Sequence, residues 1–185
     1  MIARYVEAPE EYAGDRPSIF LAGGITGCPD WQADAARMLA GVPVAVLNPR
    51  RPHFDISDPT ATEKQIRWEY THLHRAAVVL FWFPAGPSPQ PIALYELGAM
   101  AATDRRIAVG ADPDYVRRAD VRIQLELSRP EVVVRSDLAG TVAAAIAALA
   151  QASGVQGSGV QDPGPRGSGP KGSGPRGSGP PGGGG

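Results

Sequence analysis

The chain has 185 residues, of which 43% are hydrophobic, and this size and composition suit one compact globular domain. Its formal net charge is −1, and without the charged residues of the last thirty positions the rest carries 15 basic and 18 acidic residues, near −3. This balance excludes a general electrostatic attraction to a nucleic acid polymer or to an anionic membrane surface.

Cys28 is the single cysteine, so no internal disulfide can form and a reducing compartment is expected. Residues 1–16 carry several acidic side chains and lack the apolar core of a signal peptide. No run approaches the roughly eighteen apolar residues of a membrane helix. We therefore expect a cytoplasmic protein without a membrane partner.

The composition divides the chain into three parts. Residues 1–16 form an N-terminal extension, 17–153 the enzyme-like domain and 154–185 a tail. From Val155 the tail consists of five-residue units such as VQGSG and PRGSG, with no aromatic residues. It cannot bury enough surface to offset its ordering entropy, so we predict a disordered Gly/Pro/Ser-rich tail.

The first half of the domain begins with an apolar strand over residues 18–22. Asp30 is predicted to cap a helix that runs through residue 40. A second strand follows over residues 42–47, and a long loop rich in Pro, Asp and Arg extends over 48–61.

The middle of the domain holds the strongest strand signal. Thr62 and Gln65 fit a capping box for a helix that runs to about residue 76. Residues 77–83 are apolar on both faces, which is typical of a central parallel strand. Pro91 suits the first position of a helix that runs to about residue 102.

The last third repeats the alternation. Residues 106–110 predict strand four, and Pro113 is expected to open helix four. Residues 131–135 predict strand five, and Ser136 is expected to cap a final Ala-rich helix that ends before Gly154.

Five strands that alternate with five helices predict an α/β protein with a doubly wound parallel sheet. The simplest arrangement is flavodoxin-like, with strand order 2-1-3-4-5. Ligands of such sheets bind outside the carboxyl ends of the strands. That edge is built from residues 23–26, 48–51, 84–91 and 110–114.

Glu96 is the first catalytic candidate. It lies early in the helix that follows the central strand, among apolar neighbours, and the helix dipole favours its ionised form modestly. The pattern leaves two interpretations open, a surface residue and a functional group that is held inward.

Glu69 is the second candidate. Helical spacing places Ile66, Tyr70 and Leu73 on the buried stripe of its helix and Glu69 beside that stripe. A surface ion pair with a neighbouring basic side chain is the plainer interpretation. Two carboxylates matter together because glycosidic cleavage uses one as nucleophile and the other as proton donor.

Gly23 and Gly24 permit close approach of the backbone to a ligand, although a tight turn explains them equally well. The sequence around them does not match the GxGxxG motif, so it gives no support for dinucleotide binding. Trp82 could stack on a base, but core packing is the commoner position of such a residue.

Asn48, Arg50 and Arg51 follow the second strand. The guanidinium groups could bind a phosphate or sugar hydroxyls, or simply lie in an exposed loop or subunit contact. The three histidines, with His53 among them, lack metal-ligand spacing, so no metal site is predicted.

Several segments together resemble the nucleoside 2-deoxyribosyltransferase family. The resemblance covers about residues 18–148. Its motifs are FLAGGI at 20–25, NPRR at 48–51, QIRWE at 65–69, LFWFP at 80–84 and YELG at 95–98. The segments 109–110, 113–115 and 118–121 are similar to its nucleoside 2-deoxyribosyltransferase-like branch.

The resemblance implies a flavodoxin-like fold and a retaining double displacement on a nucleoside, without a metal or organic cofactor. Glu96 matches the family's nucleophile, and Glu69 matches the acid that assists departure of the base, often Asp in the family. Many members carry another Asp shortly before the nucleophile, where this chain has Pro89, Gln90 and Pro91. The substrate-binding residues expected are Gly23, Gly24, Asn48, Arg50, Arg51, Trp82, Pro84 and Pro91.

The predicted function is transfer of the sugar of a (deoxy)nucleoside to another base through a covalent sugar–glutamate intermediate. A nucleotide or nucleoside N-glycosidase, in which water accepts the sugar, is one alternative, and a non-catalytic nucleotide-binding module is another. The expected partners are a nucleoside or nucleotide and a nucleobase. A homo-oligomer is also expected, because some members of the family complete their site with a neighbouring subunit.

Overall fold

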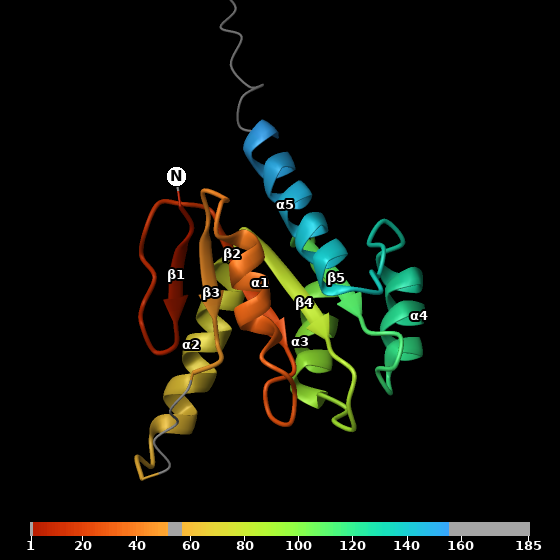
Figure 1. Cartoon of the computed structure of the whole chain (residues 1–185), viewed down its shortest axis with the longest axis horizontal. Helices are drawn as coiled ribbons and strands as arrows, with labels where there is room; N and C mark the ends of the chain where they lie inside the picture. The colour runs from red at the N-terminus through yellow and green to blue at the C-terminus, as the bar shows by residue number, and fades with distance from the viewer. Residues whose placement is uncertain (1, 52–56, 156–185) are drawn as a thin grey trace, which may run out of the picture.

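The computed structural model describes residues 2–51 and 57–155 as a three-layer α/β domain (Figure 1). The predicted tail lies outside the described residues from position 156 on, and so does part of the predicted loop, at 52–56. The described residues form a sheet with helices on both faces, as doubly wound proteins do.

The sheet has five parallel strands in the order β1-β3-β2-β4-β5. The strands are β1 (Arg4–Glu7), β2 (Ser18–Gly23), β3 (Ala45–Asn48), β4 (Val78–Phe83) and β5 (Ile107–Ala111). All six residues of β4 are buried, because β4 lies inside the sheet and both of its faces are covered by helices.

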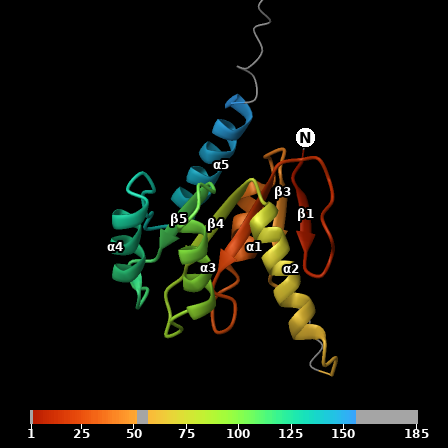
Figure 2. The ribbon, with the colours of Figure 1, turned by 180° about the vertical axis from the view of Figure 1, so that it is seen from behind.

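Helices α1 (Trp31–Leu39) and α5 (Leu138–Val155) cover one face of the sheet, nearer the viewer in Figure 1. Helices α2 (Ala61–Arg75), α3 (Pro91–Ala101) and α4 (Arg118–Ser128) cover the other, as the view from behind shows (Figure 2). Two separate apolar clusters fill the space between the helices and the sheet. Alternate strand residues point into each cluster, as the pleat requires.

The predicted fold class is confirmed, and strands β3-β2-β4-β5 stand in the predicted order. The fifth strand is a different segment from the one expected. Residues 131–135 form no strand, and Arg135 alone makes an isolated bridge to Gly110. Val133 in this segment is 60% exposed.

The fifth strand is β1, which pairs along its whole length with β3 at the opposite edge of the sheet. Its sequence, RYVE, buries only Val6 fully. A four-residue edge strand with a single buried apolar side chain gives little pattern, and the sequence prediction therefore missed it.

Two predicted helix starts are confirmed. The Asp30 carboxylate accepts a hydrogen bond from the Ala33 N–H at 3.2 Å and so caps α1. Pro91 is the first residue of α3. The position of Pro91 matters for the site because it fixes where Glu96 falls in the helix.

Three predicted helix starts are wrong. Helix α2 begins at Ala61, which places Thr62 inside it, and no side chain caps it. Pro113 lies in a turn before α4, which begins at Arg118. Asp137 rather than Ser136 caps α5, because its carboxylate accepts from the Gly140 N–H at 2.7 Å.

Candidate active site

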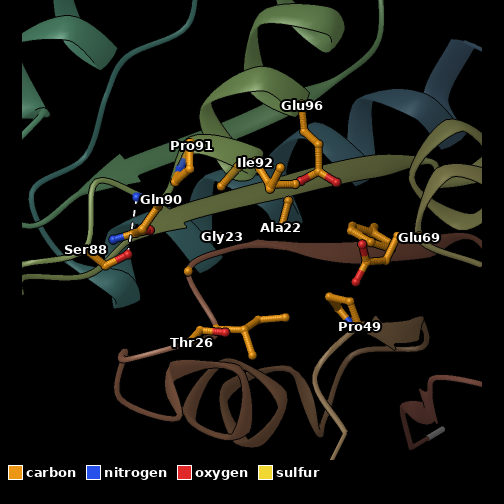
Figure 3. Close-up of a pocket in the computed structure, with 14 residues that line it drawn as sticks. Ala22, Gly23, Thr26, Pro49, Glu69, Ser88, Gln90, Pro91, Ile92 and Glu96 are labelled. Atoms are coloured by element: carbon orange, nitrogen blue, oxygen red, sulfur yellow. Dashed lines mark hydrogen bonds between the residues drawn. The ribbon is translucent and has the colours of Figure 1, made fainter. Parts of the chain in front are cut away.

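A pocket of about 260 Å³ opens at the carboxyl edge of the sheet, close to the ~300 Å³ at which small-molecule sites usually begin (Figure 3). The end of β2, the loop after β3, helix α2 and the start of α3 form its walls. It lies at the sheet edge where the fold predicts a ligand. Its lining residues are Phe20, Ala22, Gly23, Gly24, Ile25, Thr26, Pro49, Glu69, Ser88, Gln90, Pro91, Ile92, Ala93 and Glu96.

Glu96 lies in the second turn of α3 and directs its carboxylate toward β2 at Ala22 (Figure 3). Burial, and then the nearby charge of Glu69, raise its pKa to about 7. Of the two interpretations that the sequence left open, the inward-facing one matches its position. A carboxyl group with this pKa exchanges its proton near neutral pH.

Glu69 reaches the same pocket from α2. Its carboxylate accepts a hydrogen bond from Gln65 Nε2 at 2.7 Å, and the same nitrogen donates to the Pro49 carbonyl at 2.8 Å. Burial raises the pKa of Glu69, while the Gln65 hydrogen bond and the charge of Arg51 act in the opposite direction. The charge of Glu69 also acts on Glu96, so the two carboxyl groups interact electrostatically within one pocket.

The predicted surface ion pair of Glu69 does not form with its basic neighbours on α2. Arg67 pairs with Glu63 at 2.7 Å, and Lys64 pairs with Asp58 at 3.0 Å. These two basic side chains of α2 are thus engaged with other carboxylates.

The buried face of α2 differs from the predicted one. Ile66 and Tyr70 are 59% and 66% exposed, whereas Trp68 and His72 are buried. Trp68 Nε1 donates to the Glu10 carbonyl at 2.8 Å, and the His72 ring stacks on the Trp68 ring at 4.1 Å. This rotation of the helix turns Glu69 toward the pocket.

Gly23 and Gly24 line the pocket where the chain passes over the sheet edge. Gly23 has φ +152°, and a Cβ on it would lie 2.1 Å from the Trp82 carbonyl oxygen. A Cβ on Gly24 would lie 2.5 Å from Cys28 Sγ and 2.6 Å from the Gln90 side chain. Gly23 requires glycine because its φ is positive and the Trp82 backbone leaves no room for a Cβ, whereas a side chain on Gly24 would have to displace the side chains of Cys28 and Gln90.

Trp82 packs in the apolar cluster under α1 and α5 and is 5% exposed. It does not line the pocket, so the structure gives no support for base stacking on this ring. Pro84 also lies outside the lining, but its carbonyl accepts from Gln90 Nε2 at 3.1 Å. Pro91 lines the pocket.

Asn48 and Arg50 lie outside the lining as well and organise the loop beside it. Asn48 Nδ2 donates to the Tyr5 hydroxyl at 2.5 Å, and its Oδ1 accepts from the Arg50 N–H at 3.0 Å. The Arg50 guanidinium donates to the Pro29 carbonyl at 2.7 Å, to Gln32 Oε1 at 3.0 Å and to the Cys28 carbonyl at 3.1 Å. Arg51 acts on the site through its charge near Glu69.

The sequence prediction placed residues 84–91 at this edge of the sheet but did not select Ser88 and Gln90, which line the pocket, as binding residues. Gln90 has left-handed backbone angles, φ 48° and ψ 56°, and is 5% exposed. A non-glycine residue in this conformation leaves no signal in a single sequence. The flanking Pro89 and Pro91 were the available hint, since they restrict the chain on both sides of it.

Within residues 2–51 and 57–155, no three His, Cys, Asp or Glu side chains are grouped so that they could hold a metal ion. His53, which the sequence prediction considered, lies outside the described residues. None of the helices in this part of the chain combines the length and apolarity needed to cross a membrane.

A doubly wound parallel sheet with two coupled carboxylates in a pocket at its carboxyl edge defines a flavodoxin-like α/β domain with an enzyme-like site. Residues 16–115 match the family described as nucleoside 2-deoxyribosyltransferase like, and the chain belongs to this family. The matched segment contains every lining residue of the pocket. No curated protein matches the sequence significantly.

The family resemblance predicted from the sequence is thereby confirmed. Membership in a family of nucleoside-modifying enzymes supports an enzymatic function and a nucleoside as the kind of substrate.

Proposed function

We propose that this protein cleaves the N-glycosidic bond of a (deoxy)nucleoside through a covalent sugar–Glu96 intermediate and transfers the sugar to another base. The observation that carries the proposal is the pairing of Glu96 and Glu69 in one pocket, where the negative charge of Glu69 helps to raise the pKa of Glu96. Such a pair supplies one ionised and one protonated carboxyl group near neutral pH.

In the first step, a Glu96 carboxylate oxygen bonds to the sugar C1′ while the C1′–N bond breaks. The electron pair of that bond passes to the leaving base, and Glu69 donates a proton to a base nitrogen. In the second step, a nitrogen of the acceptor base attacks C1′, Glu96 departs as a carboxylate, and Glu69 takes up the proton of the acceptor.

The proton distribution within the pair has to support these roles. In this structure, Gln65 and Arg51 favour negative charge on Glu69. Positive charge that develops at C1′ beside Glu96 stabilises the Glu96 carboxylate instead. When the sugar reacts, Glu96 therefore carries the negative charge, and the proton is on Glu69 until it passes to the base.

Water in place of the acceptor base would make the protein an N-glycosidase, which shares the first step. A phosphate of a nucleotide substrate was one of the ligands that the sequence suggested for Arg50 and Arg51. The Arg50 guanidinium already donates to three groups of the neighbouring loop and helix, so Arg50 gives little support for a phosphate site. A homo-oligomer and a cytoplasmic location remain predictions.

The test is incubation of the full chain with a panel of deoxynucleosides, with and without a second free base. Exchange of the base supports transfer, whereas release of free base alone supports hydrolysis. Mass spectrometry of the quenched wild-type reaction is expected to find a sugar adduct on the peptide that contains Glu96. Binding without turnover, unchanged in Glu96→Gln, would instead identify a non-catalytic binding module.

A further inference from the structure

The segment between β1 and β2 is joined to helix α2 by two hydrogen bonds. Both are made by residues 8–12, which we call the strap. Trp68 Nε1 on α2 donates to the Glu10 carbonyl at 2.8 Å, and the Tyr12 N–H donates to His72 Nε2 at 3.2 Å. The two bonds lie about one helical turn apart, so the strap fixes the rotation of α2 about its axis as well as its position.

The ring of His72 can accept a hydrogen bond from the strap because of what its other nitrogen contacts. Nδ1 lies 2.8 Å from the Trp68 carbonyl, which can only accept, so Nδ1 carries the proton and Nε2 is the acceptor. The Glu11 carboxylate lies 3.6 Å from Nε2, but its side chain is 71% exposed. The buried contact is therefore the one between the ring and the Tyr12 backbone.

The strap is itself anchored to the sheet. It follows β1, which pairs along its whole length with β3, and the Ala8 N–H donates to the Asn48 carbonyl at 3.0 Å. Further along, the hydroxyl of the buried Tyr12 donates to the Arg16 carbonyl at 2.9 Å. The strap thus connects α2 to the carboxyl end of β3, next to the pocket.

His74, two positions further along α2, shows what the strap adds to His72. Its Nδ1 also lies 2.8 Å from the carbonyl of the residue four positions earlier, Tyr70, and the two rings lie 4.0 Å apart. The ring of His72 makes the same kinds of contact with Trp68. The two histidines therefore have similar contacts within the helix, and His72 has the bond to the strap in addition.

The two attachment points lie on either side of Glu69 in the sequence of α2. Trp68 precedes it directly, and its ring centroid lies 6.1 Å from that of Phe20, which lines the pocket together with Glu69. A carboxylate on the outside of a helix is about 5–6 Å from the axis, so a rotation of about 10° moves it by about 1 Å. A displacement of this size can slow a catalytic step by about 10²-fold.

We propose that the strap positions the proton donor, because its bonds to Trp68 and His72 fix the rotation of α2 that directs Glu69 toward the leaving base. Neither residue is among the described residues that line the pocket, so both are positioning residues. The strap lies outside residues 16–115, so the family match assigns it no part in the site. The inference rests on the proposed function and deepens it by adding residues that act on the proton transfer.

The first test compares two leaving bases. A purine deoxynucleoside needs a proton on its base, whereas the N7-methylated form already carries a positive charge and leaves without one. His72→Phe keeps an aromatic ring and removes both nitrogens. Its kcat is expected to fall by about 10- to 100-fold for the parent substrate and by less than about 3-fold for the methylated one. His74→Phe is the matched control and should leave both values within about 2-fold of wild type.

Two further variants test the hydrogen bonds themselves. His72→Gln can place its amide oxygen where Nε2 lies, and its kcat for the parent substrate should stay within about 5-fold of wild type. Trp68→Phe removes the other bond and should show the same selective loss as His72→Phe, which keeps the test usable if His72→Phe fails to fold. Equal losses with both substrates, as a less stable protein would give, or no loss in either Phe variant, would overturn the proposal.

A spectroscopic measurement separates this proposal from the proposed function, because it needs no turnover. The full chain is labelled with ¹³C at the glutamate side-chain carboxyl carbon, and Glu69→Gln identifies the Glu69 resonance by its loss. The resonance is expected to shift in His72→Phe and to keep its position in His74→Phe. If it shifts while no substrate is turned over, the positioning of Glu69 stands and the catalytic proposal fails. If it shifts in neither variant, the strap proposal fails whatever the activity.

Discussion

Helices α2 and α3 flank the same central strand, and each contributes one glutamate to the pocket, but the two carboxylates are held differently. Glu69 on α2 accepts a hydrogen bond from Gln65 and lies near the charge of Arg51. Glu96 on α3 is influenced chiefly by burial and by the negative charge of Glu69. The same residue type therefore has two protonation preferences within one pocket.

This contrast shows how a carboxylate pair can divide its tasks. A carboxyl group without a charge partner of its own responds most strongly to a cationic centre that forms beside it. A carboxyl group fixed by a hydrogen-bond donor keeps its orientation and suits directed proton transfer. The four predictions that follow test this division, from the largest expected effect to the smallest.

Replacement of Glu96 by Gln should have the largest effect. The variant keeps the shape of the side chain and removes the nucleophile, so turnover of a deoxynucleoside should fall by roughly 10³-fold or more. Steady-state assay of base exchange measures the loss. Glu126→Gln, an exposed glutamate on α4, is the control and should retain wild-type turnover. Normal turnover by Glu96→Gln would end the proposal that this residue forms the covalent bond.

The loss of activity in Glu69→Gln should depend on the leaving base. This dependence distinguishes the function of Glu69 from that of Glu96. For an ordinary base, the loss of the proton donor should lower kcat by about 10²- to 10⁴-fold. For a nucleoside whose base already carries a positive charge, the loss should be less than about 10-fold, because departure needs no proton.

Comparison of the two kinds of substrate in Glu69→Gln and Glu96→Gln is the measurement. Equal losses for both substrates in Glu69→Gln would show that Glu69 is not the proton donor.

The raised pKa of Glu96 predicts a dependence of stability on pH. Its pKa of about 7 exceeds the ordinary value of 4.5, so the folded state binds more protons between these values than the unfolded state. The free energy of unfolding should therefore fall as the pH rises from 4.5 to about 8, by on the order of 2 kcal/mol from this group. Urea unfolding at pH 5 and pH 8 measures it.

Glu96→Gln removes the titrating group, so its unfolding free energy should change less across this pH range than that of the wild type. At pH 8 the variant should be the more stable protein. A wild-type chain that gains stability over the same range, relative to the variant, would mean that Glu96 is not destabilised by burial.

The sequence predicted the α3 side of this comparison better than the α2 side, for a physical reason. The apolar run of β4 and the proline at the start of α3 are local signals, and together they place Glu96 at the sheet edge. The orientation of α2 depends instead on a binding place for Trp68 that residue Glu10 helps to form, 58 positions away in the chain. Helical periodicity contains no information about such a contact.

The difference between local signals and contacts made by distant residues also explains which other site residues could be predicted. Gly23 at the end of β2 and Gly24 after it were recognisable in the sequence because glycine permits close approach of the backbone, and both line the pocket. The positions of Arg50 and Trp82 were not, because a sequence does not show whether a guanidinium or a ring is already engaged by a loop or by the core. The position of the Gln90 side chain, whose Nε2 donates to the Pro84 carbonyl, depends on the fold of the 84–91 segment around it.

The smallest predicted effect concerns Gln65, a positioning residue that touches Glu69 and not the reacting sugar. Gln65→Met removes the hydrogen bond that lowers the pKa of Glu69, so the pKa of Glu69 should rise. The limb of the pH–rate profile that reports ionisation of the carboxyl pair should then move to higher pH, with a loss in kcat of about 3- to 10-fold. Gln65→Glu is the second variant, since added negative charge should move the same limb further in the same direction. Unchanged profiles in both variants, with stability preserved, would show that the hydrogen bond on α2 does not set the properties of Glu69 and that the two glutamates differ for another reason.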